Sequence, residues 1–288
     1  IGPPGAGKSM MVKALTGILP PLSYDELIET YKVHNLISKT PTLHTQTEHS
    51  RPFRSPHHSI SYAGLVGGGS YPKPGEISLA HHGVLFLDEL PEFSKQLLDI
   101  LRQPLEDKEI LISRASSSVT YPANFMLVAA MNPCPCGYYG DLKKTCICHD
   151  TQVKNYWKRL SGPILDRIDM TIAVERLDKD DFFSPPSVSD TTSPSFTYDS
   201  SSMGSLVNSA RSLQYKRFHS TQTNHMMGPK DISTYCGLDE SCKTVLGNAL
   251  EKGILTGRSF HKVLKVARTI ADLDIVTDNE TQEPHQLT

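Results

Sequence analysis

The first nine residues limit the possible folds of this chain more than any other part of its 288-residue sequence. They read Ile-Gly-Pro-Pro-Gly-Ala-Gly-Lys-Ser, and residues 2–9 match the phosphate-loop pattern G-x-x-x-x-G-K-[ST] in full. In this pattern glycines let backbone N–H groups face phosphates, the lysine reaches the outer phosphates, and the hydroxyl can bind Mg²⁺. A helix-forming run follows and adds the positive end of its dipole. We therefore predict a nucleotide site that is formed by Gly2, Pro3, Pro4, Gly5, Ala6, Gly7, Lys8, Ser9 and Met10.

Two short apolar runs, each followed by polar residues, predict the strands that carry the rest of this site. Asp88 and Glu89 follow the run at 84–87, and Asn132 follows the run at 125–130. Such runs suit buried parallel strands, whose carboxyl ends meet at the edge where these folds bind ligands. We predict that Asp88 holds Mg²⁺, Glu89 orients the attacking water and Asn132 senses the γ-phosphate. Two alternatives stay open, because strand ends often carry solvated acids and an Asn before proline often forms a turn.

The order of the predicted elements is loop, helix, strand, helix, hairpin and strand, which is typical of an α/β nucleotide-binding sheet. Residues 184–205 are rich in Ser, Thr, Pro and Asp, and beyond them apolar residues recur at helical spacing. We predict a P-loop α/β core over 1–183, with a parallel sheet flanked by helices and with β-hairpin insertions. A linker over 184–205 and a small helical lid over 206–288 complete the predicted organisation.

Four of the six cysteines are grouped as Cys134-x-Cys136 and Cys146-x-Cys148. Four thiolates in one loop are typical of a structural zinc site, although the usual signature has two residues between paired cysteines. Reduced cytosolic thiols are the alternative, and disulfides are less expected beside a nucleotide site. Cys236 and Cys242 lie in the helical region and are expected to be ordinary buried thiols.

Charge and hydropathy exclude one class of protein and leave another open. No stretch approaches the roughly 18 consecutive apolar residues that a membrane-spanning helix needs. The formal net charge is −2, but residues 203–268 hold ten Lys or Arg against four Asp or Glu, a local +6. This segregation has two readings, a solvated helical surface or a surface for DNA or a partner.

Read together, these motifs resemble those of the magnesium-chelatase-like AAA+ ATPases of the ComM/YifB family. The resemblance covers nearly the whole chain, and the strings PFRSPHH and NPCPCG are far more specific than the phosphate loop, which many unrelated enzymes share. It rests on the phosphate loop and on residues 51–59, 67–69, 74–81, 83–93, 132–137, 161–169 and 265–273.

The resemblance implies an ATP-hydrolysing ring, expected to be a cytoplasmic hexamer, that uses ATP and Mg²⁺ and acts on DNA in branch migration during natural transformation. It also implies roles for two arginines that their local sequence would leave as surface charges. Arg167 would be the arginine finger for the neighbouring subunit, and Arg258 the sensor arginine of the lid. Residues 108–122 would form a hairpin near the ring pore. Basic residues expected to reach DNA phosphates there are Lys108, Arg114, Lys143 and Lys144.

Two other functions stay open at this point. One is the motor subunit of a metal chelatase, which shares the ATP site, and the other is a regulator without hydrolysis. The sequence also departs from the family pattern, because no leading strand or further domain precedes the phosphate loop and the chain ends before the final lid helix that the resemblance implies. We therefore expect the chain to be a piece of a longer protein.

Overall fold

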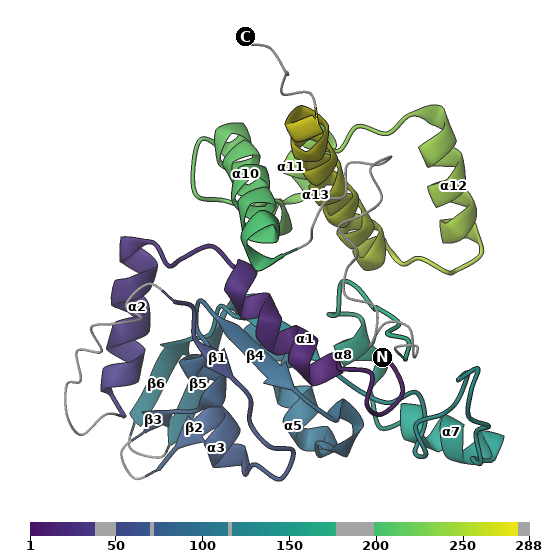
Figure 1. Ribbon diagram of the computed structural model, residues 1–288. Helices are drawn as coiled ribbons and strands as arrows, with labels where there is room; N and C mark the ends of the chain where they lie inside the picture. Colours follow the sequence, from purple (N-terminus) through teal and green to yellow (C-terminus); the bar gives the residue numbers. More distant parts are fainter. Residues whose placement is uncertain (38–49, 70–71, 115–116, 177–198, 282–288) are drawn as a thin grey trace. The chain divides into compact units, whose positions relative to one another are not determined.

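The computed structural model describes residues 1–37, 50–69, 72–114, 117–176 and 199–281, which belong to two compact units, Ile1–Ser195 and Phe196–Thr288 (Figure 1). Most of the predicted linker, residues 184–198, lies outside the described residues, as do residues 282–288 of the predicted lid. Helix α10 begins at Ser200, inside the stretch expected to be a linker. It begins there because the Asp199 side chain accepts a hydrogen bond from the backbone N–H of Ser202 at 2.7 Å and caps the helix.

The first unit is an α/β layer structure with short insertions. Its elements are α1 (Lys8–Leu15), η1 (Thr16–Ile18), α2 (Tyr24–Asn35), β1 (Phe53–Arg54), α3 (Tyr62–Val66), β2 (Gly67–Gly68), β3 (Lys73–Pro74), α4 (Glu76–Leu79), β4 (Val84–Leu87), η2 (Leu90–Glu92), α5 (Lys95–Ile100), α6 (Arg102–Asp107), β5 (Glu109–Arg114), β6 (Ser117–Pro122), β7 (Met126–Ala129), α7 (Asp150–Trp157) and α8 (Gly162–Leu165). The predicted hairpin is confirmed, because β5 and β6 pair antiparallel along their whole length.

A parallel sheet with the order β1-β4-β7 forms the centre of this unit. Figure 1 labels its strands β1 and β4. Every residue of the central strand β4 is at most 2% exposed, so the strand is covered on both faces, as its uninterrupted apolar run predicts. The register pairs Val84 with Met126 and Leu87 with Ala129. Side chains that follow the two strands therefore reach the same edge of the sheet.

Ile1 and Gly2 extend this sheet beyond β7. The backbone N–H of Gly2 donates to Met131 O at 3.2 Å, and Val174 N donates to Ile1 O at 2.7 Å. The terminal amino group of Ile1 donates to Ile172 O at 2.7 Å. The two residues at the start of the phosphate loop are thus hydrogen-bonded to Met131 on one side and to residues 172 and 174 on the other. Residues 170–174 form no regular strand, because the described chain offers them only Ile1 as a hydrogen-bonding partner.

The main core of the first unit lies against the sheet and under the β5–β6 hairpin. It combines strand residues with the apolar faces of α3, α4 and α5 and with the inward side of the hairpin. Its members include Leu65, Ile77, Leu85, Leu87, Leu98, Leu101, Ile110, Ile112, Tyr121 and Ile164. Burial of side chains of this size contributes roughly 1.5–3 kcal/mol each to the stability of the fold. The sheet and its edge are therefore held firmly by the core.

The second unit is helical. It contains α10 (Ser200–Phe218), η3 (Asn224–Met226), α11 (Pro229–Tyr235), α12 (Glu240–Glu251) and α13 (Gly257–Thr281) (Figure 1). Its small apolar core is formed by Met227, Ile232 and Leu264, with Phe218 and Phe260 packed against them. A core of this size supports the unit together with polar contacts.

A buried ion pair joins α10 to α13 in this unit. Asp272 has no solvent exposure, and Arg217, whose side chain is 11% exposed, grips its carboxylate with both Nη atoms. Asn224 Nδ2 also donates to Asp272 at 2.8 Å, and Arg268 approaches it at 3.0 Å. Burial alone would raise the pKa of Asp272, but the hydrogen bonds from Arg217 and Asn224 outweigh it and hold the pKa below its usual range.

Among the helices that the structure describes, none is both long enough and apolar enough to span a membrane.

Gly2→Ala is expected to destabilise the first unit, because an added Cβ would lie 2.2 Å from the carbonyl oxygen of Val174. The free energy of unfolding should fall by about 1–3 kcal/mol, which thermal or urea unfolding measures. Gly17→Ala is the matched control, since a Cβ there meets nothing within 4 Å. Equal stability of the two variants would contradict the tight packing of Gly2 against residue 174.

Asp272→Asn is expected to destabilise the helical unit by about 3–5 kcal/mol, because it leaves the Arg217 guanidinium buried without its counter-charge. Far-UV circular dichroism during urea unfolding measures the loss, and Asp274→Asn, at an exposed position of the same helix, is the control. Asp272 has a lowered pKa in the folded state, so its charge stabilises the fold above the ordinary aspartate pKa. The gap between wild type and variant should therefore close as the pH falls through the lowered pKa, and a gap unchanged in acid would count against the ion pair.

Candidate functional site

The phosphate loop crosses from Gly2 to the start of α1 through two left-handed residues. Gly5 has φ +80° and Gly7 has φ +79°, a conformation that glycine adopts without a steric penalty. Gly7 is the residue before α1 and, as a glycine, has no side chain that could cap the helix. The free N–H groups of the first turn of α1 therefore remain available at the end of the loop, as an anion site needs.

Lys8 is the centre of the hydrogen bonds around this loop. Its Nζ donates to Gly2 O at 2.6 Å, to Pro3 O at 2.8 Å and to Asn132 Oδ1 at 3.1 Å. Burial lowers the pKa of Lys8, and the charge of Asp88 partly offsets this. The ammonium group thus joins the loop to the residue that follows β7.

Ser9 and Asp88 meet beside Lys8. Ser9 Oγ donates to Asp88 Oδ2 at 2.6 Å, and Asp88 Oδ1 accepts from the backbone N–H of Glu89 at 2.9 Å. Hydroxyl and carboxylate oxygens are donors that Mg²⁺ prefers, and two adjacent ligands of its octahedron lie about 2.9 Å apart. The chemistry of the two oxygens therefore fits a magnesium ion, which would replace the hydrogen bond between Ser9 and Asp88.

Glu89 lies at the exposed end of the same turn. Its backbone is left-handed, with φ 52° and ψ 47°, and its side chain is 60% exposed. Its Oε2 lies 3.3 Å from Nδ1 of His58, whose ring contacts the rings of His57 and Phe93. Sequence reasoning gave His58 no role. The signal that points to it is the parallel pairing of β1 with β4, which sends the segment after β1 to the same edge as Asp88 and Glu89.

The two predicted arginines belong to different units of the structure. Arg167 Nη2 donates to Glu106 at 2.5 Å and its Nη1 donates to Pro163 O at 2.6 Å, and the side chain is only 12% exposed. Arg258 belongs to the second unit, in the first turn of α13, where its side chain is exposed. Thr256 and Ser259 exchange hydrogen bonds around that turn, so the helix start next to Gly257 is capped.

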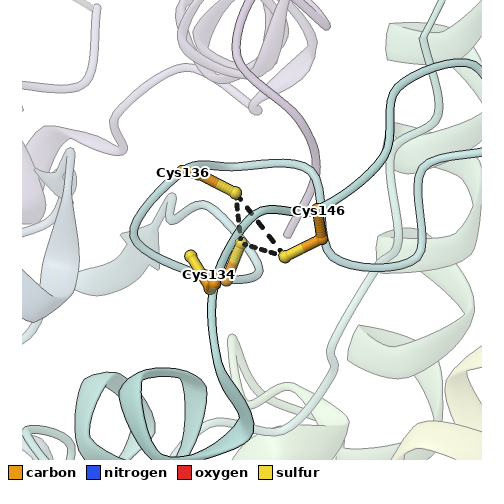
Figure 2. Close-up of side chains that lie close together, drawn as sticks. Cys134, Cys136 and Cys146 are labelled. Atoms are coloured by element: carbon orange, nitrogen blue, oxygen red, sulfur yellow. Dashed lines mark hydrogen bonds between the residues drawn. The ribbon is translucent and has the colours of Figure 1, made fainter.

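Four thiols form a second candidate site. The sulfurs of Cys134, Cys136, Cys146 and Cys148 all lie within 4.8 Å of one another. Figure 2 shows three of them in a triangle, with distances of 3.4 Å (134 to 136), 3.7 Å (134 to 146) and 3.6 Å (136 to 146). A tetrahedral zinc ion with bonds of about 2.3 Å sets its sulfurs about 3.8 Å apart. These distances fit such an ion, whereas a disulfide needs about 2.05 Å.

The sulfurs of this loop differ in their affinity for a proton. The backbone N–H of Tyr138 donates to Cys136 and lowers the pKa of this thiol to about 6. The backbone N–H of Cys148 also favours the thiolate of Cys146, but burial and the neighbouring thiols prevail and raise the pKa of Cys146 to about 12.

Cys242, expected to be buried, is exposed on α12, because its position in the first turn places it beside the capping residue Asp239 instead of the core.

Glu29, His81 and His82 form a cluster with the residue types of a metal site. The ring nitrogen of His81 that faces this cluster, however, carries a proton. Nδ1 of His81 accepts a hydrogen bond from the backbone N–H of Asn124 at 3.0 Å, so its proton is on Nε2, which faces Glu29 at 3.2 Å. Burial lowers the pKa of His81 to about 4, and the ring is neutral. A metal ion at Nε2 would have to displace that proton, so the cluster is better explained as hydrogen bonding between α2 and the turn before β4.

Family models match both units of this chain, and curated proteins resemble it along most of its length. The family model described as magnesium chelatase, subunit ChlI, matches residues 1–182, and the model of the ChlI C-terminal region matches residues 197–285. Competence protein ComM of Haemophilus influenzae is 44% identical over 286 residues, which is 99% of this chain and 53% of that protein. A protein of Escherichia coli called YifB is 42% identical over 288 residues, 98% of this chain and 54% of that protein. Magnesium-chelatase subunit ChlI of Euglena gracilis is 26% identical over 154 residues, 46% of this chain.

The chain thus spans about half the length of the most similar of these relatives, and both of its units are matched. A parallel sheet that holds a complete phosphate loop, with a helical unit behind it in the sequence, is the architecture expected of an AAA+ P-loop core. The family suggests an ATPase that uses ATP and Mg²⁺. On this evidence the chain belongs to the magnesium-chelatase-like AAA+ family that includes ComM and YifB.

Proposed function

We propose that this chain is the motor region of an ATP-hydrolysing ring that moves or remodels DNA, as in a helicase or a branch-migration enzyme for natural transformation or recombination. The observation that carries the proposal is the convergence of Lys8, Ser9, Asp88 and Asn132 through direct hydrogen bonds. Three separate sequence segments supply these groups, and each has the chemistry that phosphoryl transfer needs. A relative named as a competence protein supports a role in competence, and we propose DNA as the substrate of that role.

Each residue of the nucleotide site has a defined task in this proposal. The Lys8 ammonium exchanges its carbonyl acceptors, Gly2 and Pro3, for the outer phosphates, while Asn132 stays within reach of the same charge. Ser9 Oγ and Asp88 hold Mg²⁺, which neutralises phosphate charge when it is bound. Glu89, exposed at the end of the turn, orients the attacking water, and His58 lies on its carboxylate.

Arg167 and Arg258 are proposed to complete the active site, and Arg167 does so only in an assembled ring. Arg167 would leave Glu106 and reach the nucleotide of the next subunit in a hexamer, where such a residue contributes about 10³–10⁵ in rate. Its pairing with Glu106 keeps the guanidinium in place until a subunit with a more negative target docks. Arg258, exposed at the start of α13, is proposed as the sensor arginine of the lid.

The four-cysteine loop is proposed to carry a structural zinc ion, in addition to ATP and Mg²⁺ at the nucleotide site. Its support is the spacing of four sulfurs, which matches the edge of a tetrahedral site. Free thiols at all described cysteines agree with a reducing compartment, and we propose the cytoplasm.

The proposed DNA contacts belong to two segments of the first unit, the β5–β6 hairpin and the four-cysteine loop. The β5–β6 hairpin follows Lys108, and Arg114 is the last residue of β5. In the four-cysteine loop, Asp141 accepts hydrogen bonds from the backbone N–H groups of Lys143 and Lys144 and so holds both exposed lysines in one turn. The exposed ring of Tyr139 lies in the same loop and offers a face on which a base can stack.

A chelatase motor subunit is the second candidate, since family members named ChlI share the nucleotide site. The likeness to the Euglena ChlI protein covers 46% of the chain, whereas the likeness to ComM covers 99% of it. We therefore favour a DNA motor.

Glu89→Gln in the full-length protein should bind ATP and release phosphate at least about 100-fold more slowly, because an amide cannot orient and polarise water as a carboxylate does. Phosphate release and equilibrium ATP binding measure the two effects separately. Glu92→Gln is the control, because Glu92 pairs with Arg159 at 2.8 Å on the surface and has no part in the proposed chemistry. Normal phosphate release by the Glu89 variant would refute the assignment.

Retention of the full-length protein on single-stranded DNA should fall steeply with added salt. Replacing both Lys143 and Lys144 with Ala should reduce the slope of log affinity against log salt by about 1.4, since each lost phosphate contact removes about 0.7. Lys32→Ala, at an exposed position on α2, is the control and should leave the slope unchanged. Salt-independent retention, or a slope that the double variant leaves intact, would argue against these contacts.

A further inference from the structure

The nucleotide site and the four-cysteine loop are joined by three consecutive residues. Asn132 accepts from Lys8 at 3.1 Å, Pro133 O accepts from Trp157 Nε1 at 3.0 Å, and Cys134 has no solvent exposure. Each residue of this strip is therefore held by a different part of the first unit. A displacement of the buried thiol would be passed to Asn132 through a single proline.

A second connection is a direct contact between the two loops. Gly137 is buried and left-handed, with φ +86°, and a Cβ added to it would lie 2.6 Å from Cδ of Pro4 in the phosphate loop. Its N–H donates to Cys134 O at 3.0 Å and closes the turn that carries the first two cysteines. The backbone of the cysteine loop thus packs against the phosphate loop with no room for a methyl group.

Apart from its cysteines, the loop is held by turn hydrogen bonds to Asp141 and by an ion pair between Asp141 and Arg176 at 3.4 Å, and not by a helix or strand. Between Gly137 and His149 the described chain forms neither helix nor strand, and apolar side chains such as Leu142 and Ile147 are 98% and 82% exposed. What brings its two ends together is the approach of Cys146 and Cys148 to the first pair of sulfurs. Whatever fixes these four sulfurs also fixes Gly137 against Pro4.

We propose that one zinc ion on Cys134, Cys136, Cys146 and Cys148 is a strut for the phosphate loop, so that zinc occupancy and nucleotide affinity are coupled. The coupling rests on the proposed ATP site for its readout, whereas the zinc centre rests on the sulfurs alone. Thermodynamic linkage requires the effect to be reciprocal. Bound Mg·ATP raises the affinity for zinc by the same factor as bound zinc raises the affinity for Mg·ATP. A factor of about 5 to 150 is the usual range for coupled sites.

The test uses the full-length protein with Glu89→Gln, so that ATP is bound but not consumed. Zinc content is measured after purification without chelator, and Mg·ATP affinity is measured by calorimetry. The same protein is then stripped of zinc with a chelator under reducing conditions and reloaded with zinc alone. We expect one zinc per chain, at least a 5-fold weaker affinity for Mg·ATP after stripping, and recovery after reloading. Circular dichroism checks that the stripped protein retains its helices and strands.

Two glycine variants separate the contact from the metal. Gly137→Ala should retain zinc but lose at least 5-fold in Mg·ATP affinity, because its methyl group displaces Pro4. Gly140→Ala is the matched control, since Gly140 is equally left-handed, with φ +79°, and a Cβ there meets nothing within 4 Å. Cys148→Ser should lose zinc, whereas Cys242→Ser, at an exposed thiol of α12, should retain it.

The outcomes distinguish this inference from the proposed ATPase. A protein without stoichiometric zinc overturns the metal centre, and a protein whose Mg·ATP affinity ignores both zinc removal and Gly137→Ala overturns the coupling; neither result touches the ATPase. Failure of the zinc-loaded protein to bind Mg·ATP at all overturns the coupling and the proposed function together. The zinc centre is then judged by the measured zinc content alone.

Discussion

The in-register pairing of β4 with β7 is the constraint on which the nucleotide site depends. The pairing continues past both strands, because Ala130 N donates to Leu87 O and Leu90 N donates to Ala130 O, each at 3.0 Å. Asp88 and Asn132 are thereby fixed on neighbouring segments at one edge of the sheet. Gly2 is hydrogen-bonded to Met131, which precedes Asn132, so the phosphate loop begins at that edge as well. A slip of one residue would turn every side chain of β4 to the opposite face.

Much of this arrangement is predictable from short patterns. The phosphate loop has a fixed spacing, the apolar runs at β4 and β7 are long enough to identify buried strands, and β5–β6 alternates as a hairpin should. The parallel order of the strands follows from the helices between them. These features depend on residues that are close in the sequence, and short sequence patterns therefore predict them.

Other features depend on partners that are distant in the sequence. Strand β1 has only two residues, too few to show a period, and the contact between His58 and Glu89 follows from its pairing with β4. Arg167 meets Glu106 across 61 residues, and Arg217 meets Asp272 across 55, so local sequence marks neither arginine as a member of a pair. Residues 170–174 have the composition of a strand, but a regular ladder requires a partner longer than Ile1.

Trp157 gives the first unit an optical property that its role as a hydrogen-bond donor does not suggest. It is the only tryptophan in the chain, and its indole N–H is bonded to Pro133, between the nucleotide site and the buried thiol of Cys134. Excitation of tryptophan therefore selects one spot of the molecule, and the helical unit contributes nothing to that emission. The protein carries a built-in probe at the junction of its two loops, without any label.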